Sequence, residues 1–337
     1  MNSDGTKVIV GATHEDSYSG SYTDAGSAYI FTYDGSSWDT GAKIMSSDSQ
    51  ANDFFGTSVA ISGDGTKVIV GAWYKSSQVG AAYIFAYNGT SWSQEQKIEA
   101  SDKQVSDYFG MNVYMSGDGT KVLVGAHGED AGGLSDAGAA YIFAYSSGSW
   151  SQEAKLVASD AQAVDYFGKS VSINSDGTKV VVGADSEDTG AGNAGAAYIF
   201  AYSSGSWSQE DKLMASDAQA NDHFGIDVSM SSDGTKVIVG APDEDTSANL
   251  AGAAYIFAYN SSSSSWSQED KIQSSAINTE DYFGYGVSMN SNGTKVLVGA
   301  WRADTGASDA GAAYIFDYNS NQIFDSSTQV FTATGSG

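Results

Sequence analysis

The chain of 337 residues has no cysteine, one proline and only 15 lysine and arginine residues. Without cysteine there are no disulfide bonds and no cysteine-ligated zinc or iron–sulfur site. The 41 acidic residues give a formal net charge of −26 at pH 7, which argues against nucleic acid as a partner because phosphates would be repelled. No apolar run approaches the roughly 20 residues that cross a bilayer, so direct membrane insertion is not expected.

Three short motifs recur throughout the chain. Val-Gly-Ala occurs six times, Ala-Tyr-Ile-Phe follows every copy, and Phe-Gly stands between copies five times. A fixed period that spans a chain is the signature of a repeat protein. We therefore predict one domain over residues 1–333, followed by a tail at 334–337. The predicted repeats are 1–52, 53–106, 107–164, 165–221, 222–280 and 281–333.

Each repeat has the pattern of four β-strands. Apolar residues alternate after Phe-Gly, and the Lys-Val-Ile-Val-Gly-Ala and Ala-Tyr-Ile-Phe segments are rich in β-branched and aromatic residues. The fourth strand begins at a tryptophan and is more polar, as an outer edge strand is. Asp-Gly or Asn-Gly, the preferred two-residue hairpin turns, joins the first two strands. No segment has helical periodicity, so we predict an all-β fold, a β-propeller of six four-stranded blades.

The first blade is expected to lack its first strand, because Met1 aligns with Met289, where that strand ends in the sixth repeat. One interpretation is that the chain is part of a longer protein with further domains. The other is a complete protein whose first blade has three strands. Six blades and a seven-bladed ring both remain open.

The pattern FGxxVSxxxDGTKVIVGA…GAAYIFAY…WSQExKLxASDxQxxDYFG resembles the FG-GAP repeats of bacterial and protist surface proteins, and more distantly the integrin α-subunit head. The resemblance implies an extracellular propeller, secreted or on the cell surface, that serves adhesion or ligand binding. Members of the family often carry a DxDxDG calcium loop. Here that loop is SGDGTK or SSDGTK, with one carboxylate, so the family's calcium site is not transferred to it.

Acidic residues gather in the loops that should share one face of the propeller. Where two of these loops meet, their carboxylates could ligate a hard cation such as calcium. The alternative is local, since aspartate in loops also accepts hydrogen bonds from nearby backbone N–H groups. A glutamate precedes four of the five aspartates, and the pair is lost in repeat two, so we interpret it as less needed for folding and better suited to a ligand role. The candidate metal ligands are Asp16, Asp130, Asp188, Asp245 and Asp304.

Two positions near this acidic face vary between otherwise similar repeats. One directly follows Val-Gly-Ala, and the other directly precedes Phe-Gly. Exposed aromatic residues there would suit a protein or glycan ligand. By contrast, the recurring tryptophan of the fourth strand is expected to pack. The candidate ligand-binding residues are Trp73, His127, Asp185, Trp301, Tyr108, Tyr166, His223 and Tyr282.

Signatures of catalysis are missing from the sequence. The three histidines form no HExxH motif, and no predicted helix could follow a nucleophile elbow or a P-loop. Paired carboxylates are plentiful, but they recur once per blade, whereas an active site breaks symmetry. We therefore predict a non-catalytic adhesion or ligand-binding propeller whose acidic face binds calcium if it binds metal. The alternatives are a carbohydrate-binding lectin and a polysaccharide hydrolase or lyase on the same scaffold.

Overall fold

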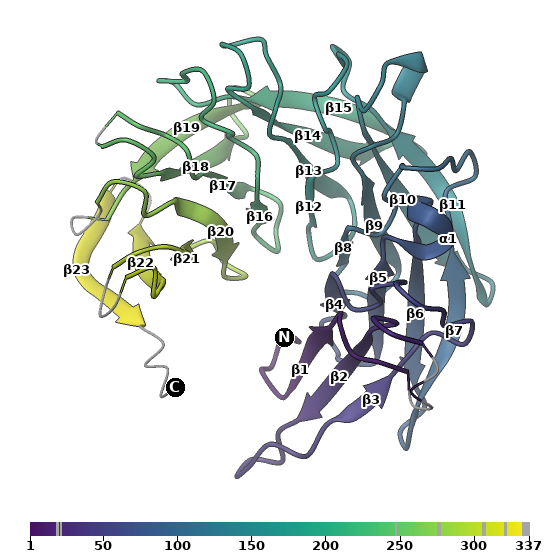
Figure 1. Ribbon diagram of the computed structural model, residues 1–337. Coiled ribbons are helices and arrows are strands. Elements are labelled where there is room, and N and C mark those ends of the chain that lie inside the picture. The colour runs from purple at the N-terminus through teal and green to yellow at the C-terminus, as the bar shows by residue number, and fades with distance from the viewer. Residues whose placement is uncertain are drawn as a thin grey trace. The chain divides into compact units, whose positions relative to one another are not determined.

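The computed structural model describes residues 1–17, 20, 22–246, 248–274, 278–304, 308–319 and 322–331, the last of these by backbone alone (Figure 1). The chain divides into two compact units, Met1–Gly177 and Thr178–Gly337. The predicted tail at 334–337 lies outside the described residues, and the single domain over 1–333 stays a prediction. No helix among the described residues is long and apolar enough to span a membrane.

The first unit contains a three-stranded sheet, two four-stranded sheets and the first strand of the fourth blade. Its strands are β1 (Lys7–Ala12), β2 (Ser27–Thr32), β3 (Ala42–Ile44), β4 (Val59–Ile61), β5 (Lys67–Ala72), β6 (Ala81–Tyr87), β7 (Trp92–Ile98), β8 (Asn112–Met115), β9 (Lys121–Ala126), β10 (Ala139–Ser146), β11 (Ser149–Leu156) and β12 (Ser170–Ile173).

The second unit contains the rest of the fourth blade and two four-stranded sheets. Its strands are β13 (Lys179–Ala184), β14 (Ala196–Ser203), β15 (Ser206–Leu213), β16 (Val228–Met230), β17 (Lys236–Ala241), β18 (Ala253–Asn260), β19 (Ser265–Ile272), β20 (Phe283–Met289), β21 (Lys295–Ala300), β22 (Ala312–Asn319) and β23 (Gln322–Phe331).

The architecture is the predicted one, an all-β propeller of six antiparallel blades. The first blade has three strands and lacks the strand that would precede β1, as the alignment of Met1 with Met289 indicates. The only helical segments among the described residues are single turns, α1 (Lys75–Gln78) and η1 (Ala131–Gly133). Both lie in the loops between the second and third strands of their blades.

The Asp-Gly turns use their one carboxylate to close the hairpin. Asp64 Oδ1 accepts a hydrogen bond from the backbone N–H of Thr66 at 2.9 Å, and Gly65 has a φ of 68°. Asp118 and Thr120 make the same contact at 2.9 Å. The carboxylate satisfies a local backbone donor, as in an Asx-turn, which supports the interpretation of these loops as turns.

Successive blades of the first unit meet backbone to backbone at glycines. A methyl group at Gly71, in β5, would lie 1.9 Å from the carbonyl oxygen of Gly110, just before β8. Gly80 and Phe109 form a parallel β-bridge across the same interface. Phe109 is fully buried against Tyr141, with ring centroids 5.6 Å apart. Only glycine permits so close an approach of two backbones, so the Val-Gly-Ala and Phe-Gly motifs are explained by the contact between them.

The opposite ends of the blades are joined by lysines. Lys67, at the start of β5, places its Nζ 3.6 Å from the ring centroid of Tyr145 and 5.1 Å from that of Trp150, both in the next blade. Lys7 lies over Tyr87 in the same way, but at 5.7 Å. The prediction that the recurring tryptophan packs is confirmed for Trp150, which is buried beside Tyr145, and for Trp266, whereas Trp38 is 45% exposed.

We predict that Lys67→Met lowers the free energy of unfolding by about 1–2 kcal/mol, since a partly desolvated cation–π contact is worth that much. Urea denaturation measures the change. Lys7→Met is the matched control and should cost less than half as much, because its ammonium group lies farther from the ring. Equal losses in the two variants would contradict the assignment.

Candidate functional site

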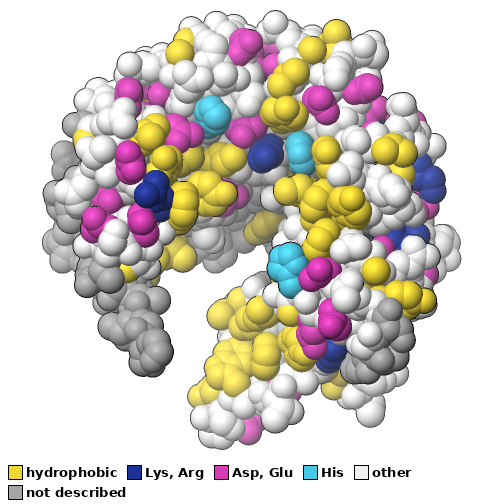
Figure 2. Space-filling view, viewed as in Figure 1, with side chains coloured by type: hydrophobic (Ala, Val, Ile, Leu, Met, Phe, Trp, Pro, Cys, Tyr) yellow, Lys and Arg dark blue, Asp and Glu magenta, His cyan; other side chains and the backbone are white. Residues whose placement is uncertain are grey.

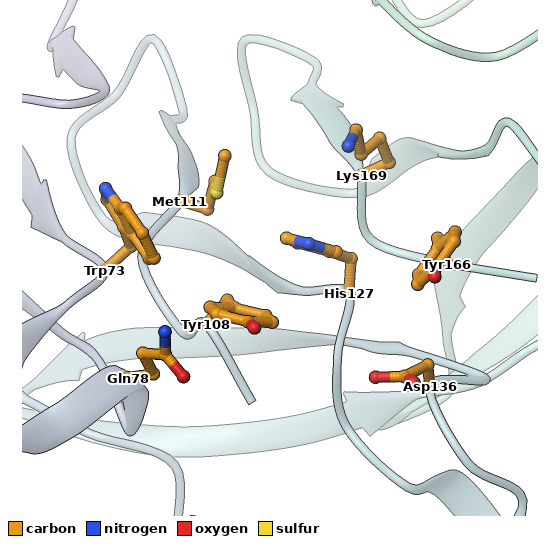
Figure 3. Close-up of a pocket in the computed structure, with 8 residues that line it drawn as sticks. All are labelled: Trp73, Gln78, Tyr108, Met111, His127, Asp136, Tyr166 and Lys169. Atoms are coloured by element: carbon orange, nitrogen blue, oxygen red, sulfur yellow. The ribbon is translucent and has the colours of Figure 1, made fainter. Parts of the chain in front are cut away.

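The two variable positions of the repeat meet between blades and build a row of aromatic rings. Trp73 follows β5, and its ring centroid lies 5.6 Å from that of Tyr108, which precedes β8. Tyr108 stacks on His127 at 5.0 Å with an interplanar angle of 13°. His127 in turn meets the edge of Tyr166 at 5.9 Å. Figure 3 shows these rings side by side. Three successive blades therefore contribute to one aromatic surface.

The row continues into the first blade. Phe54 stacks on Trp73, with centroids 5.6 Å apart and an interplanar angle of 9°. His14 meets the edge of Phe54 at 5.3 Å. Six rings thus run without a break from His14 to Tyr166. On the face viewed in Figure 2, hydrophobic, histidine and acidic side chains lie close to one another.

A pocket of about 500 Å³ opens over the centre of this row. Four of its lining residues are the predicted Trp73, Tyr108, His127 and Tyr166. This volume lies within the range of small-molecule sites. The other four lining residues add polar and flexible groups: Gln78, Met111, Asp136 and Lys169.

The aromatic residues that precede Phe-Gly are held in a conformation that disfavours them. Tyr108 and Tyr166 have φ angles of 58° and 56°, in the left-handed region where a side chain other than that of glycine or asparagine costs about 1–2 kcal/mol. The same holds for Phe54, His223 and Tyr282. A position that served only the turn would favour glycine or asparagine. Aromatic residues at all five positions indicate that the ring itself is useful.

His127 is a neutral, incompletely satisfied group at the back of the pocket. Its side chain is only 9% exposed, and its buried Nδ1 has no hydrogen-bond partner among the described residues. Burial, assisted by the positive charge of Lys169, lowers the pKa of His127 to about 4. The imidazole is therefore uncharged at neutral pH.

Four of the eight predicted ligand-binding residues belong to the second unit and do not line this pocket. Asp185 is buried. His223 lies 3.6 Å from the carboxylate of Asp243. Tyr282 packs against Trp301 at 5.5 Å, and Trp301 remains 54% exposed.

Sequence analysis missed Gln78, Met111, Asp136 and Lys169. A signal existed for all four of them. Met111 and Lys169 directly follow Phe-Gly, a third position that varies between repeats. Gln78 and Asp136 stand two residues before the glycine of Gly-Ala-Ala, a fourth position that varies.

The aspartates predicted as metal ligands take part in local hydrogen bonds. Asp16, Asp130 and Asp188 each accept a backbone N–H from a residue five to eight positions later in the same loop, at 3.2, 3.0 and 2.6 Å. Asp304 accepts the N–H of Asp309 at 2.8 Å. No hydrogen bond of this kind joins Asp245 to a residue that the structure describes. Within the described part of the chain, no three His, Cys, Asp or Glu side chains come together as a metal cage. Calcium binding by the five aspartates stays a prediction.

The glutamates that precede these aspartates have a structural role. Glu129 is 3% exposed and forms an ion pair with Lys155 at 2.7 Å. Lys155 also pairs with Asp102 at 2.7 Å, and Asp102 accepts a hydrogen bond from the Tyr141 hydroxyl at 2.9 Å. Glu244 and Lys271 make the same pair at 2.8 Å. The interpretation that the Glu-Asp pair is not needed for folding is therefore wrong for its glutamate, whose buried charge is paired with lysine.

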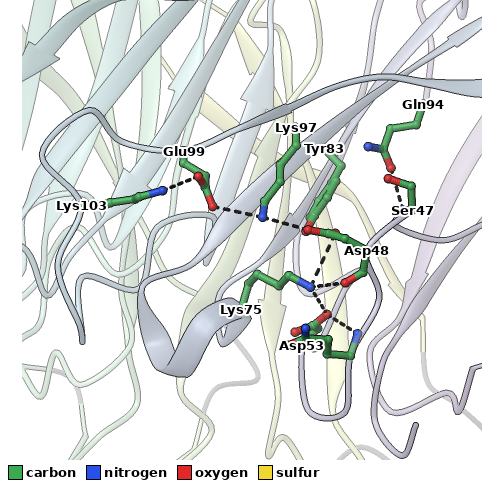
Figure 4. A network of polar contacts seen from close by, with 10 residues as sticks. Ser47, Asp48, Asp53, Lys75, Tyr83, Gln94, Lys97, Glu99 and Lys103 are labelled. Carbon is green, nitrogen blue, oxygen red and sulfur yellow. Dashed lines mark hydrogen bonds and ion pairs between the residues drawn. The ribbon is translucent and has the colours of Figure 1, made fainter. Parts of the chain in front are cut away.

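In the second blade, a buried lysine stands where the third, fourth and fifth blades have the buried glutamate. Lys75 occupies the place that Glu129 has in the third blade, and its side chain is 4% exposed. Its Nζ lies 2.8 Å from Asp53 and 3.5 Å from Asp48 (Figure 4). Lys97 pairs with Asp48 at 2.9 Å. The loss of the Glu-Asp pair in this repeat is thus a replacement by a buried lysine.

The third blade has Glu129 where the second blade has Lys75, so a buried aspartate of the third blade lies beside another acid, whereas its counterpart in the second blade lies beside a lysine. Asp107 is 2% exposed, like Asp53, but it faces Glu129 where Asp53 faces Lys75. Burial, together with the charges of Glu129 and Asp102, raises the pKa of Asp107 to about 6. Burial also raises the pKa of Asp53, although the hydrogen bond from Lys75 opposes the shift.

The blades and their repeated motifs define a repeat propeller, and rings from adjacent blades surround a pocket in its loops. The chain belongs to the FG-GAP repeat family, whose model matches residues 38–85, 92–143, 150–200, 207–257 and 266–316. Among solved structures, it is similar to a functionally unknown protein from Desulfotomaculum acetoxidans DSM 771, at 12% identity and a TM-score of 0.60. That match covers 98% of this chain and 87% of the other, and it shows the fold alone. No curated protein matches the sequence.

We predict that Asp107→Asn stabilises the protein at pH 7. Because the folded-state pKa lies above the unfolded value near 4, native Asp107 holds a proton that the unfolded chain releases, and its stabilising contribution is lost as the pH rises through about 6. The variant should therefore gain about 2 kcal/mol over the wild type between pH 4 and pH 7, measured by urea denaturation at both values.

Asp53→Asn is the matched control, at the same position of the preceding repeat. It should lower the free energy of unfolding by about 3 kcal/mol at pH 7, since it leaves Lys75 buried without its close partner. Changes of the same sign in both variants would overturn this account of the two networks.

Proposed function

We propose that this FG-GAP propeller is a non-catalytic binding protein, secreted or displayed at the cell surface, and that its aromatic pocket binds a carbohydrate. One observation carries the proposal: rings from three successive blades surround one pocket of about 500 Å³. Trp73 and His127 come from a position that varies widely between repeats. Tyr108 and Tyr166 come from a position that holds an aromatic ring in all five repeats, although the backbone there favours glycine or asparagine.

The chemistry of the lining suits a sugar. The rings of Trp73 and Tyr108 line the pocket and offer apolar surface to the C–H groups of a pyranose. Gln78, Asp136 and Lys169 stand around that surface as donors and acceptors for hydroxyl groups. The neutral imidazole of His127 adds a polar group without adding charge. Aromatic side chains together with a few placed polar groups are the usual lining of a small-ligand site.

The same lining argues against hydrolysis. Of the eight residues around the pocket, Asp136 is the only one with a carboxyl group. Glycoside hydrolases use two carboxyl groups, about 5 to 9.5 Å apart, as acid and as base or nucleophile. Asp136 also takes part in its own loop, since its backbone N–H donates to Asp130 at 3.0 Å. The pocket is therefore better suited to holding a sugar than to cleaving it.

A protein ligand is the second candidate, favoured by a separate aromatic cluster in the second unit. Tyr285 and Trp301 are each 54% exposed, with ring centroids 6.0 Å apart. Arg302 lies over the Trp301 ring at 5.5 Å. Tryptophan, tyrosine and arginine dominate the binding energy of protein interfaces, so this cluster is where an adhesion partner would bind.

We predict that Tyr108→Asn abolishes binding on a glycan array while the fold survives, because asparagine accepts the left-handed backbone at this position. Trp73→Ala should weaken binding to the same glycans at least about tenfold, or 1.4 kcal/mol. Trp38→Ala, which removes a 45% exposed tryptophan outside the pocket, is the control and should bind like the wild type.

If the wild type binds no glycan, or if Trp38→Ala loses as much affinity as Trp73→Ala, the carbohydrate assignment is wrong. Binding to a protein that is lost in Trp301→Ala and kept in Tyr108→Asn would establish the second candidate instead.

A further inference from the structure

A second pocket, of about 360 Å³, lies between the first and second blades, away from the aromatic row. Its walls come from β3 of the first blade and from the β6–β7 hairpin of the second. Tyr87 and Trp92 form one wall, with ring centroids 5.3 Å apart. Ala42 and Lys43 lie on the opposite side. No residue of this pocket lines the proposed carbohydrate site.

The next interface along the chain shows one side chain that fills this place. Between the second and third blades, Gln96 of β7 binds the main chain of Trp150 with both ends of its side-chain amide. Its Oε1 accepts the Trp150 N–H at 2.8 Å, and its Nε2 donates to the Trp150 carbonyl oxygen at 2.8 Å. Beside it, Glu95 accepts the indole N–H of Trp150 at 2.9 Å.

The first blade lacks both of these side chains. Strand register places Ala42 opposite Ile30 as Gln96 is placed opposite Ile84, and Gly41 stands where the second blade has Glu95. The side chain of Ala42 ends at Cβ and has no amide. The gap that Gln96 fills at one interface is therefore a pocket at the other.

The main chain of Trp92 is left open toward this pocket. The N–H of Tyr87 donates to the carbonyl oxygen of Thr66, just before β5, at 2.8 Å, so Tyr87 and Trp92 form a non-hydrogen-bonded pair between β6 and β7. The N–H and carbonyl oxygen of Trp92 consequently point away from β6, as those of Trp150 point away from β10. No residue that the structure describes meets either group of Trp92.

We propose that this pocket binds a primary carboxamide, as carried by the side chain of glutamine or asparagine. A primary amide presents an N–H and a carbonyl oxygen on the same side, which is the arrangement that Gln96 uses on Trp150. A trans secondary amide presents them on opposite sides and can make only one of the two bonds. Carboxylates cannot donate at all. The rings of Tyr87 and Trp92 supply an apolar wall for the aliphatic part of the ligand.

The test is an NMR titration of the whole chain, with the backbone amide of Trp92 as the reporter. The probe is N-acetyl-L-glutamine N-methylamide, in which the side chain carries the sole primary amide. It should shift the Trp92 resonance in a saturable way and slow its hydrogen exchange. The same compound with an N,N-dimethylated side-chain amide cannot donate, so it should bind at least tenfold more weakly.

Two variants exchange the features of the two interfaces. Ala42→Gln supplies the missing side chain, so Trp92 should become protected without probe and should no longer respond to it. Gln96→Ala opens the equivalent gap, so the Trp150 amide should become responsive. The proposal is overturned if Trp92 fails to respond in the wild type up to the solubility limit of the probe, if the dimethyl compound binds equally well, or if Ala42→Gln leaves the response unchanged.

A parallel titration with free L-glutamine separates the two sources of this group. Tighter binding of the blocked probe assigns the site to a glutamine or asparagine side chain in a polypeptide. Equal or tighter binding of the free amino acid assigns it to the metabolite. Either result supports recognition of the carboxamide.

Discussion

Backbone contact between glycines of successive blades is the constraint on which the site of the first unit depends. Gly71 of Val-Gly-Ala meets Gly110 of the next Phe-Gly so closely that no side chain fits between them. The residue two places after Gly71 is then forced beside the residue two places before Gly110. Those residues are Trp73 and Tyr108, whose rings lie 5.6 Å apart. The position of the aromatic row is a consequence of a contact that folding requires. The type of side chain at these positions can change without disturbing that contact, which leaves it available for ligand binding.

The large negative charge of the chain is partly offset inside the structure. Lysines of the fourth strand, such as Lys155, bind a glutamate and an aspartate at once. Lysines at the other end of the blades lie over aromatic rings of the next blade. Each basic residue of these sets therefore joins two or more segments of the propeller. This explains how a chain with 15 lysine and arginine residues against 41 acidic ones keeps the buried glutamates Glu129, Glu187 and Glu244 paired.

The fold could be predicted from the sequence because its six repeats can be aligned with one another. Period, turn dipeptides and alternating strands identify the blades, and the alignment of Met1 with Met289 locates the missing strand. Part of the site was accessible in the same way, since Trp73, Tyr108, His127 and Tyr166 stand out as variation within a repeat. A pocket that arises because one repeat has a smaller side chain than another was much harder to predict. Ala42 is unremarkable in the sequence, and its meaning emerges only when Gln96 is seen bound to Trp150 at the next interface.

The role of the acidic loops shows the limit of sequence reasoning more clearly. Repeat two lacks the Glu-Asp pair, and the sequence suggests that the pair is dispensable. In three dimensions Lys75 replaces the buried glutamate and pairs with Asp53, so the loss is a compensated exchange. The compensation joins residues 22 positions apart in different loops. A single sequence does not show such a pairing, because the distance between the two side chains is set by the packing of the blades.

The most direct measurement of the central claim is the nuclear Overhauser effect between the rings of Trp73 and Tyr108 in Gly71→Ala. The added methyl group would lie 1.9 Å from the Gly110 carbonyl oxygen, so the two backbones must separate. We expect the ring-to-ring effect to disappear, while that between Tyr145 and Trp150 within one blade persists. Gly192→Ala, where a methyl group meets nothing within 4 Å, should keep both effects. An undiminished Trp73–Tyr108 effect in Gly71→Ala would contradict the claim that the glycine contact positions the site.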